Sequence, residues 1–490
     1  MPRTAVVVGA GPVGCLAALA LRNAGWTVTV YDARPDMRLP ENKSQLSQRS
    51  INLAISARGI TALHSVNPKF AERFLDTAIP MRGRMIHPVH GREESQLYDL
   101  NGQCINSIDR ALLNEDLLNQ LTAASVPIVF RHKLLHADFD HKTLTFYSES
   151  DQKDVRVRYD FCIGADGCYS AVRRQLMRVV RMNYQQEYIP HEYIELRIPA
   201  GKGPSGEDTF RLDPNHLHIW PRHSFMLIAL PNKDKTFTST LFAPTAEFER
   251  FRDDKMFISW FRTHFPDALD LVGEDRLLHD YKHNPRSALI HIKTRPYHYK
   301  DNVILLGDAA HAMVPFYGQG LNCGLEDVRV LHVLLEKHRV DPENMVPDGQ
   351  VDDNLSRALQ EYTDSRHEDL DAICDLAMAN YEEMRHAVTT PMYRLRKTLD
   401  GLLSRWTPFL PFQSFFPYLS SNTFEPTPNG WLALYTMVTF RPDIRYSEVR
   451  RKAKRQDYLL SMFAWSGIAT TAGVGSLAVG LQLWARWRRC

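Results

Sequence analysis

The stretch DNVILLGDAAHAMVPFYGQGLNCGLED, from Asp301 to Asp327, decides the fold of this chain. An apolar segment, Val303 to Leu306, is followed by Asp308, and a loop rich in proline and glycine then leads to Gly320, where a helix is expected to begin. A carboxylate at the end of a buried strand can accept hydrogen bonds from a polyhydroxyl chain, and the N–H groups at a helix start favour nearby negative charge. A flavin with its ribityl chain requires both features, so the stretch predicts a flavin site.

The N-terminal stretch AVVVGAGPVGCLAALALRNAGWTVTVYDA predicts a strand, a glycine-rich turn, a helix and a second strand that ends at Asp32. Gly9 and Gly11 allow a tight turn and the close approach of a pyrophosphate, while Gly14 lets the helix pack against the sheet. Asp32 follows at a spacing that suits a hydrogen bond to a ribose hydroxyl. NAD and FAD proteins share this pattern, so by itself it predicts a dinucleotide site of either kind.

Composition narrows the class of protein. A chain of 490 residues, 44% of them hydrophobic, is long enough for two or three domains. A formal net charge of +2 argues against nucleic acid as a partner. Seven scattered cysteines without a CxxC pair indicate a reducing compartment and argue against a disulfide framework or a zinc site. Met1 leads almost directly into the first strand, so we expect no cleavable presequence.

The C-terminal residues 459–485 contain no charged side chain. About 20 apolar residues suffice to cross a bilayer as a helix, and Trp465, Trp484 and Trp487 suit the two interfaces. We therefore expect a transmembrane anchor here, with the body of the protein on the cytosolic side next to the basic run from Arg450 to Arg455. A buried helix and a helix lying in the membrane interface are the alternatives.

The remaining patterns predict an α/β fold with a Rossmann-type FAD-binding domain, an antiparallel-sheet substrate domain, a C-terminal helical region and the transmembrane helix. The FAD-binding domain is expected to be discontinuous, and helical patterning from Leu355 to Leu403 is interrupted at Pro391. The predicted segments are 1–80, 101–180 and 294–345 for the FAD-binding domain, 81–100 and 181–293 for the substrate domain, 346–458 for the helical region and 459–485 for the anchor.

Three motifs occur in a fixed order: the GxGxxG at Gly9, GADG at Gly164 to Gly167, and GDAAH at Gly307 to His311. In this combination the chain resembles the single-component flavoprotein aromatic hydroxylases of the para-hydroxybenzoate hydroxylase type. The resemblance implies a bound FAD, NADPH as the co-substrate and O2 as the oxidant. Because no second GxGxxG follows a strand, we expect NADPH to bind at a transient surface site.

The same resemblance assigns residues to FAD. Gly9, Gly11, Gly14 and Asp32 would hold the adenosine diphosphate part, and Arg110 would lie along the pyrophosphate and the ribityl chain. Asp166 with Gly167 would serve both FAD and NADPH, although a structural role in the turn is an equal alternative for Asp166. The residues implied at the ribityl and isoalloxazine are Asp308, Gly320, Leu321 and Asn322.

Further segments are similar to the branch of this family that hydroxylates L-kynurenine to 3-hydroxy-L-kynurenine, in tryptophan catabolism and NAD biosynthesis. This similarity covers about residues 3–450, and the apolar tail fits members placed in the mitochondrial outer membrane. The segments are RSINLAISARG (Arg49 to Gly59), GRMIH (Gly83 to His87), HIWPR (His218 to Arg222), VPFYGQGLN (Val314 to Asn322), NYEEMR (Asn380 to Arg385) and LYTMVTF (Leu434 to Phe440).

The resemblance also implies a substrate pocket. Arg84 and Tyr98 would bind the substrate carboxylate, since a guanidinium can grip a carboxylate through two hydrogen bonds. Both side chains point to one side if the strand of Met81 to His87 pairs with that of Gln96 to Leu100. Asn380 and Met384 share a helical face because they are four residues apart. The other residues implied in the pocket are Tyr435, Phe316, Tyr317 and Phe237, with Leu217, Ile228 and Leu230 as further lining.

We expect no side chain to act as acid or base, because the aniline nitrogen of the substrate already activates the ring. His311 is more simply explained as a structural histidine. Two alternatives stay open at this point. One is a related flavin monooxygenase that acts on another aromatic acid or a quinol precursor, and the remote one is a non-catalytic, tail-anchored scaffold with a flavin fold.

Overall fold

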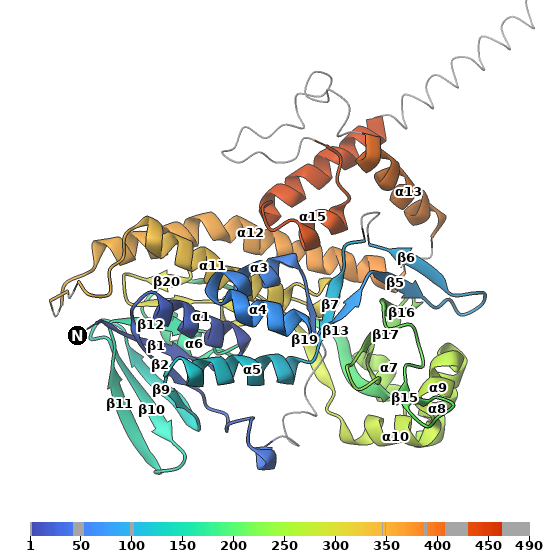
Figure 1. Cartoon of the computed structure of the whole chain (residues 1–490), viewed down its shortest axis with the longest axis horizontal. Coiled ribbons are helices and arrows are strands. Elements are labelled where there is room, and N and C mark those ends of the chain that lie inside the picture. The colour runs from blue at the N-terminus through green and yellow to red at the C-terminus, as the bar shows by residue number, and fades with distance from the viewer. Residues whose placement is uncertain are drawn as a thin grey trace, which may run out of the picture.

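The computed structural model describes residues 2–42, 53–98, 102–344, 346–347, 349–386, 388, 390–406 and 430–462. Two large sheets dominate this part of the chain, with helices packed over and between them (Figure 1). The first sheet contains the N-terminal strands and the strand before Asp308. The second contains Arg84 and most strands between residues 183 and 295.

The first sheet has six strands in the order β20-β21-β12-β1-β2-β8, and every neighbouring pair except β20 with β21 is parallel. Parallel strands must be covered on both faces, which explains why β12 and β21 consist of buried residues throughout. The strands are β1 (Thr4–Val8), β2 (Thr27–Tyr31), β8 (Ile128–Val129), β12 (Phe161–Gly164), β20 (His298–Tyr299) and β21 (Val303–Leu305).

Helices from distant parts of the sequence pack beside this sheet. α1 (Pro12–Asn23) follows β1 directly and lies against the helices α3, α5 and α11. These are α3 (Ala57–Val66), α5 (Arg110–Ala123) and α11 (Gly320–Lys337). The small antiparallel sheet of β9 (His132–Asp138), β10 (Thr143–Ser148) and β11 (Lys153–Arg158) extends from the same half and contacts α6 (Ala171–Leu176).

The second sheet has seven strands in the order β19-β13-β18-β17-β16-β5-β6. It is antiparallel except for the pair β16 and β5, so the predicted antiparallel sheet is a mixed one. The strands are β5 (Gly83–Ile86), β6 (Glu94–Leu97), β13 (Asn183–Ile198), β16 (His216–Arg222), β17 (Phe225–Pro231), β18 (Phe237–Pro244) and β19 (Ser287–Arg295).

Short helices between β18 and β19 cover one face of this sheet with a separate apolar core that includes Phe237 and Phe257. The sequence patterns predicted only strands in this region. The helices are α7 (Thr245–Arg250), α8 (Asp254–His264), α9 (Pro266–Val272) and α10 (Glu274–His283). Smaller sheets are formed by β3 (Leu53–Ile55), β4 (Ile79–Met81) and β7 (Ile105–Ile108), and by β14 (Gly201–Lys202) with β15 (Asp208–Thr209).

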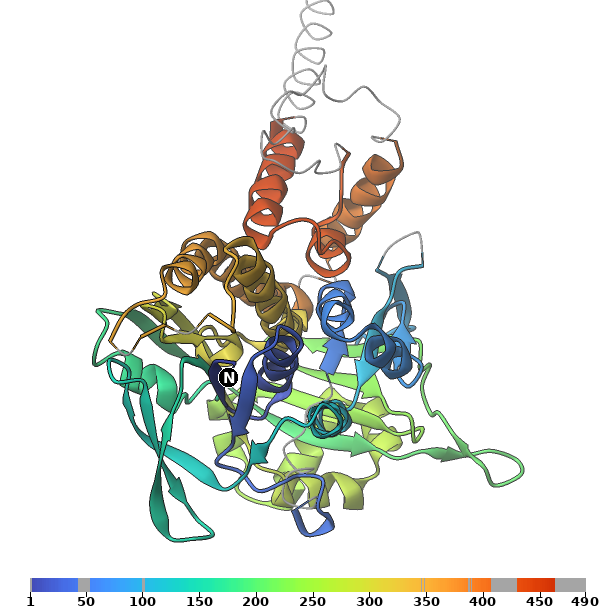
Figure 2. The same ribbon diagram turned by 60° about the vertical axis from the view of Figure 1, so that its left-hand side comes forward.

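The long helix α12 (Asp353–Arg385) runs along α11 and ends beside the seven-stranded sheet. α13 (Pro391–Trp406) begins at the proline that the sequence marked as an interruption. The short helix α15 (Leu434–Phe440) and a helix over residues 446–462 follow, and together with α13 they stand on top of α11, α12 and α3 (Figure 2).

The expected transmembrane helix over residues 459–485 requires a correction. No helix in the described part of the chain is both long enough and apolar enough to cross a bilayer. The described helix over 446–462 begins with a strongly charged stretch, and residues 463–485 of the expected span lie outside the described residues. The predicted anchor, and with it the tail-anchored placement in the mitochondrial outer membrane, is therefore not supported and is withdrawn.

Candidate active site

The turn between β1 and α1 has the shape that a pyrophosphate requires. Gly9 has a φ of +107°, and a β-carbon on either Gly9 or Gly14 would overlap backbone carbonyl oxygens. A β-carbon on Gly11 would meet nothing within 4 Å, and Gly11 starts α1 without a side chain to cap the helix. The open side of the turn therefore faces the start of a helix, where phosphate oxygens can accept backbone N–H groups.

Asp32 follows β2 and is buried, with a carboxylate that reaches back to the glycine-rich turn. It accepts hydrogen bonds from the backbone N–H of Ala10 at 2.7 Å and from the Arg34 guanidinium at 2.8 and 3.0 Å. Burial favours a higher pKa for Asp32, but the hydrogen bonds and charge of Arg34 lower this pKa below its usual value. Asp32 is thus an ionised acceptor beside the turn, as a ribose site needs.

The GADG motif places Asp166 where it serves the protein itself. Its carboxylate accepts hydrogen bonds from the Ser170 hydroxyl at 2.5 Å and from the backbone N–H groups of Ala171 and Val172 at 2.6 and 3.1 Å. These contacts satisfy the first N–H groups of α6, so the structure favours the structural alternative for Asp166. Arg110 is the first residue of α5 and is exposed.

The loop from Gly307 to Asn322, which we call the flavin loop, joins β21 to α11. Gly307 has a φ of +59° and packs against Val13 of the helix that follows the glycine-rich turn. Asp308 is exposed and is therefore free to face a ligand, and Leu321 is half-buried in the first turn of α11. At this start of α11, Gln319 provides no side-chain hydrogen bond as a cap. The exposed carboxylate of Asp308 and the uncapped N–H groups at the start of α11 are groups that suit the ribityl chain and ring of a flavin.

Asn322 holds the flavin loop in place instead of pointing outward. Its side-chain oxygen accepts a hydrogen bond from the N–H of Ser56 at 2.8 Å, and its amide donates to the carbonyls of Ala54 at 2.8 Å and Gly318 at 2.6 Å. These bonds tie α11 to the segment before α3. An expected cofactor residue thus acts in this structure by shaping the loop.

Arg84 and Tyr98 lie on the same side of the second sheet. Arg84 pairs with Gln96 across β5 and β6, and the N–H of Tyr98 donates to the carbonyl of Arg82 at 3.0 Å. Alternate residues of a strand face the same side, so the pairing places both side chains together as predicted. The rings of Tyr98 and Tyr435 stack with centroids 4.6 Å apart, and the Arg84 guanidinium lies 4.9 Å from the Tyr435 ring.

Arg84 is almost fully buried and has one donor to spare. Its guanidinium contacts Glu383 at 3.0 Å and the side-chain oxygen of Asn380 at 3.4 Å. Among the described residues its buried Nε has no hydrogen-bond partner. A buried donor without a partner is costly, and a carboxylate that binds here would remove that cost.

Aromatic side chains of the flavin loop stack on rings of α12 and α15. Tyr317 stacks on Tyr435 at 5.6 Å, and Phe316 stacks on Tyr381 at 4.0 Å. Asn380 donates to the carbonyl of Phe316 at 2.7 Å and to the sulfur of its buried neighbour Met384 at 3.2 Å. The helix α12 therefore fixes the loop that carries the expected ring-binding residues.

Phe237 is not brought to this pocket. It packs against Phe210 and His218 in the core under α7 to α10, on the other face of the sheet. Phe242 of the same strand contacts Phe316 at 4.9 Å instead. Residues 237 and 242 are separated by an odd number of positions, so the alternation of a strand sends them to opposite faces. The expected lining residues Leu217, Ile228 and Leu230 do lie in one cluster with Tyr98 and Tyr435.

Three residues beside Arg84 were absent from the expected pocket. Glu383 contacts Arg84 and accepts a hydrogen bond from the Tyr393 hydroxyl at 3.2 Å. Lys397 lies nearby on α13, and burial together with the positive charge of Arg84 lowers the pKa of Lys397 to about 8. The position of Glu383 in the NYEEMR segment was a usable signal, whereas nothing in the sequence marked the two residues of α13.

Known flavoproteins resemble this chain in sequence and in fold. Residues 3–339 match the family model described as FAD binding domain. Solved structures of 2-methyl-3-hydroxypyridine-5-carboxylic acid oxygenase share the fold, one with a TM-score of 0.61 and 20% identity over 82% of this chain and 97% of that chain. The chain is therefore an FAD-binding flavoprotein with the fold of flavin-dependent aromatic monooxygenases.

Relatives cover nearly the whole chain. Kynurenine 3-monooxygenase from Cryptococcus neoformans var. neoformans serotype D is 46% identical over 97% of this chain and 96% of the relative. The proteins of the same name from Yarrowia lipolytica and Saccharomyces cerevisiae are 46% and 44% identical over 96% and 94% of this chain, and over 96% and 94% of their own lengths. The chain belongs to the kynurenine 3-monooxygenase family.

Proposed function

We propose that this protein hydroxylates L-kynurenine to 3-hydroxy-L-kynurenine, with FAD bound and with NADPH and O2 consumed. The observation that carries the proposal is the buried Arg84, whose Nε lacks a partner among the described residues and whose guanidinium lies beside Tyr435, a ring that stacks on Tyr317 of the flavin loop. An anionic aromatic substrate held there would have its ring beside the start of α11. The names of the full-length relatives support the same substrate.

Arg84 would bind the substrate carboxylate through its free Nε and one terminal nitrogen, and the Tyr98 hydroxyl would add a further hydrogen bond. Phe316, Tyr317 and Tyr435 would enclose the aromatic ring and exclude water, which protects the reaction from unproductive side reactions. Phe242 joins this wall through its contact with Phe316. The protein thus orients the substrate and keeps the site dry.

FAD, once bound, supplies the redox chemistry of the hydroxylation. In this proposal Gly9, Gly11 and Gly14 form the cradle for its pyrophosphate, and Asp32 accepts from its ribose. Arg110 would lie beside the pyrophosphate, and the ribityl and ring would meet residues of the flavin loop and of α11. Those residues are Asp308, Gly320 and Leu321, with Asn322 behind them.

No side chain is needed as a general base. His311 is buried, and its Nε2 lies 2.5 Å from the carboxylate of Asp327. This contact holds the flavin loop, which agrees with the expected structural role of His311. The aniline nitrogen of kynurenine donates electron density to the ring and so activates the ring carbon ortho to this nitrogen.

A substrate panel tests the proposal. Purified flavoprotein would be incubated with NADPH, labelled O2 and either L-kynurenine or another aromatic acid, and the products would be analysed by mass spectrometry. The proposal expects one labelled oxygen in 3-hydroxy-L-kynurenine. Labelled product from a different aromatic acid or a quinol precursor, with none from L-kynurenine, would assign the protein to another substrate.

A further inference from the structure

The short helix α15 positions Tyr435 in the pocket, and its other end is held by one arginine. Tyr435 lies in the first turn of α15, whereas Met437 and Val438 supply carbonyls near its C-terminus. Arg58 of α3 donates to the carbonyl of Val438 at 2.7 Å and to that of Met437 at 3.4 Å. It also donates to the carbonyl of Ile444 at 2.5 Å, just beyond the helix.

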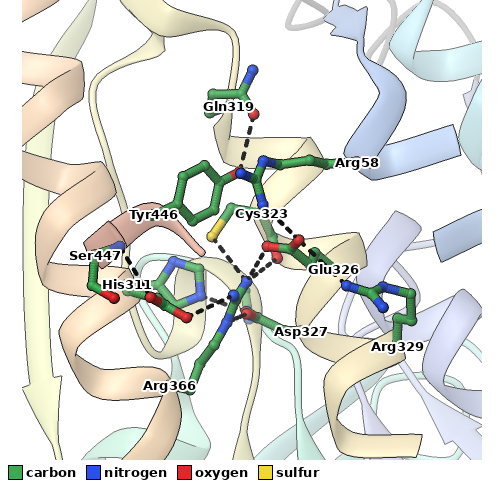
Figure 3. Close-up of polar contacts among 12 residues, drawn as sticks. Arg58, His311, Gln319, Cys323, Glu326, Asp327, Arg329, Arg366, Tyr446 and Ser447 are labelled. Atoms are coloured by element: carbon green, nitrogen blue, oxygen red, sulfur yellow. Dashed lines mark hydrogen bonds and ion pairs between the residues drawn. The ribbon is translucent and has the colours of Figure 1, made fainter. Parts of the chain in front are cut away.

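These contacts are what a helix C-terminus requires. The last carbonyls of a helix have no partner within it and carry partial negative charge, so a cation that donates hydrogen bonds satisfies them. Arg58 is almost fully buried, and its guanidinium lies 3.9 Å from the centre of the Tyr446 ring. The guanidinium therefore closes the end of α15 from inside the protein, and Figure 3 shows it beside the Tyr446 ring.

Arg58 is in turn fixed by the helix that starts at the flavin loop. Its remaining nitrogen contacts Glu326 of α11 at 2.8 Å. Glu326 also contacts Arg366 of α12 at 2.8 Å, and Arg366 contacts Asp327 at 3.0 Å. Figure 3 shows these charged groups converging between α11, α12 and the C-terminal segment.

The same network holds both ends of the flavin loop. At one end, Asp327 accepts a hydrogen bond from the N–H of Gly307 at 3.1 Å and contacts His311. At the other end, the Tyr446 hydroxyl donates to the side-chain oxygen of Gln319 at 3.1 Å. A buried chain of contacts thus joins the flavin loop to the helix that carries Tyr435.

We propose that Arg58 is a positioning residue that fixes Tyr435 against Arg84 and Tyr98 by closing the end of α15, and that ties this arrangement to the flavin loop. The proposal rests on the proposed function, since Tyr435 is assigned to the substrate pocket. Among the residues that the structure describes, the hydrogen bonds and ion pair of Arg58 go to α15, to Ile444 and to Glu326, so it acts through these elements and not by touching the substrate residues.

The test compares Arg58→Lys with a matched control, Arg329→Lys. Arg329 also lies near Glu326, at 3.6 Å, but its side chain is partly exposed. A lysine at 58 keeps the charge but cannot supply the planar set of donors that reaches three carbonyls. We expect Arg58→Lys to retain FAD and to weaken L-kynurenine binding about tenfold. An effect of this size lies within the range of interaction energies between residues in contact. Arg329→Lys should change neither.

A double-mutant cycle separates positioning from a general loss of stability. In a Tyr435→Ala background, the effect of Arg58→Lys on the Kd of L-kynurenine should be clearly smaller, because the residue that it positions through α15 is gone. Equal effects of Arg58→Lys in both backgrounds, or an equal effect of Arg329→Lys, would overturn the proposal.

Hydrogen exchange gives a readout that does not depend on the substrate. Without ligand, the peptide containing residues 434–440 should exchange faster in Arg58→Lys than in Arg329→Lys or the wild type. If the wild-type enzyme proved not to bind L-kynurenine, the proposed function would fail while this exchange still tested Arg58. If Arg58→Lys did not fold, Arg58→Gln would keep a polar side chain with fewer donors and no charge, and unchanged exchange of residues 434–440 there would refute the role.

Discussion

The glycine-rich turn and the pocket around Arg84 are built in opposite ways. The turn belongs to one continuous segment of β1, α1 and β2, in which Gly14 lies tightly against the backbone of Gly9, and only Ala165 after β12 approaches Gly9 from a distant part of the sequence. The pocket combines β5, the flavin loop, α12 and α15, so Arg84 and Tyr435 are neighbours although 351 positions separate them (435 − 84). We therefore expect a substitution in the turn to prevent folding or FAD binding, whereas a substitution around Arg84 should remove one contact and leave the other contacts in place.

The turn should therefore show the largest effect. Gly14→Ala places a β-carbon on the carbonyl oxygen of Gly9, which neither backbone segment can avoid, so we expect no folded flavoprotein. Gly11→Ala meets open space and should fold, but with weakened FAD binding because the pyrophosphate approaches there. Thermal unfolding and the flavin absorbance of the purified variants check both outcomes. A stable, flavin-loaded Gly14→Ala protein would contradict the importance of this close packing.

The pocket should lose substrate binding without losing the cofactor. Arg84→Ala removes the only charge proposed for the substrate carboxylate, and hydrogen bonds to charged groups contribute about 1.5–3 kcal/mol each. We expect the Kd of L-kynurenine to rise roughly 10- to 100-fold with FAD content unchanged. Titration of the flavin absorbance with L-kynurenine measures both quantities. If Arg84→Ala kept its FAD and bound L-kynurenine with unchanged affinity, Arg84 would not be the residue that binds the substrate carboxylate.

Much of the fold and of the candidate site was predictable from the sequence. The strands of the turn, Asp32, the flavin loop and the pairing that brings Arg84 to Tyr98 follow from local patterns and strand alternation. Phe237 was misplaced because alternation fixes which residues share a face but leaves open which face covers a site. Glu383 and Arg58 lie in segments that the resemblance marks, but a single sequence does not show which remote helices they contact, and nothing in it marked Lys397. The C-terminal apolar run predicted an anchor that no described helix supplies.

Glu383 gives a smaller effect of opposite sign. Its carboxylate contacts the Arg84 guanidinium at 3.0 Å, where it competes with the carboxylate of a ligand. Glu383→Gln should therefore tighten the binding of an aromatic acid that lacks the amino group of kynurenine, by about threefold, as expected for a partly exposed ion pair. Glu382→Gln is the matched control, because Glu382 pairs with Arg385 on the exposed side of α12. Equal changes in both variants would show that Glu383 does not compete for Arg84.

The smallest effect should come from pH. The pKa of Lys397 lies at about 8, below the usual value for lysine, because burial and the charge of Arg84 disfavour its ammonium form. Below this pKa Lys397 is charged and adds to the positive potential around Arg84, and as pH rises through about 8 that charge is lost. Binding of the substrate carboxylate should then weaken, by about twofold for a partly exposed charge at some distance.

The variant Lys397→Met separates this effect from the titration of the substrate itself. The Kd of L-kynurenine would be measured between pH 7 and pH 9 in the wild type and in the variant. The ratio of the two Kd values should differ most from one at pH 7 and approach one above pH 8, since the wild-type lysine becomes neutral as well. A ratio that stays constant across this range would show that Lys397 does not contribute to the potential at Arg84, and the pocket would then owe its positive charge to Arg84 alone.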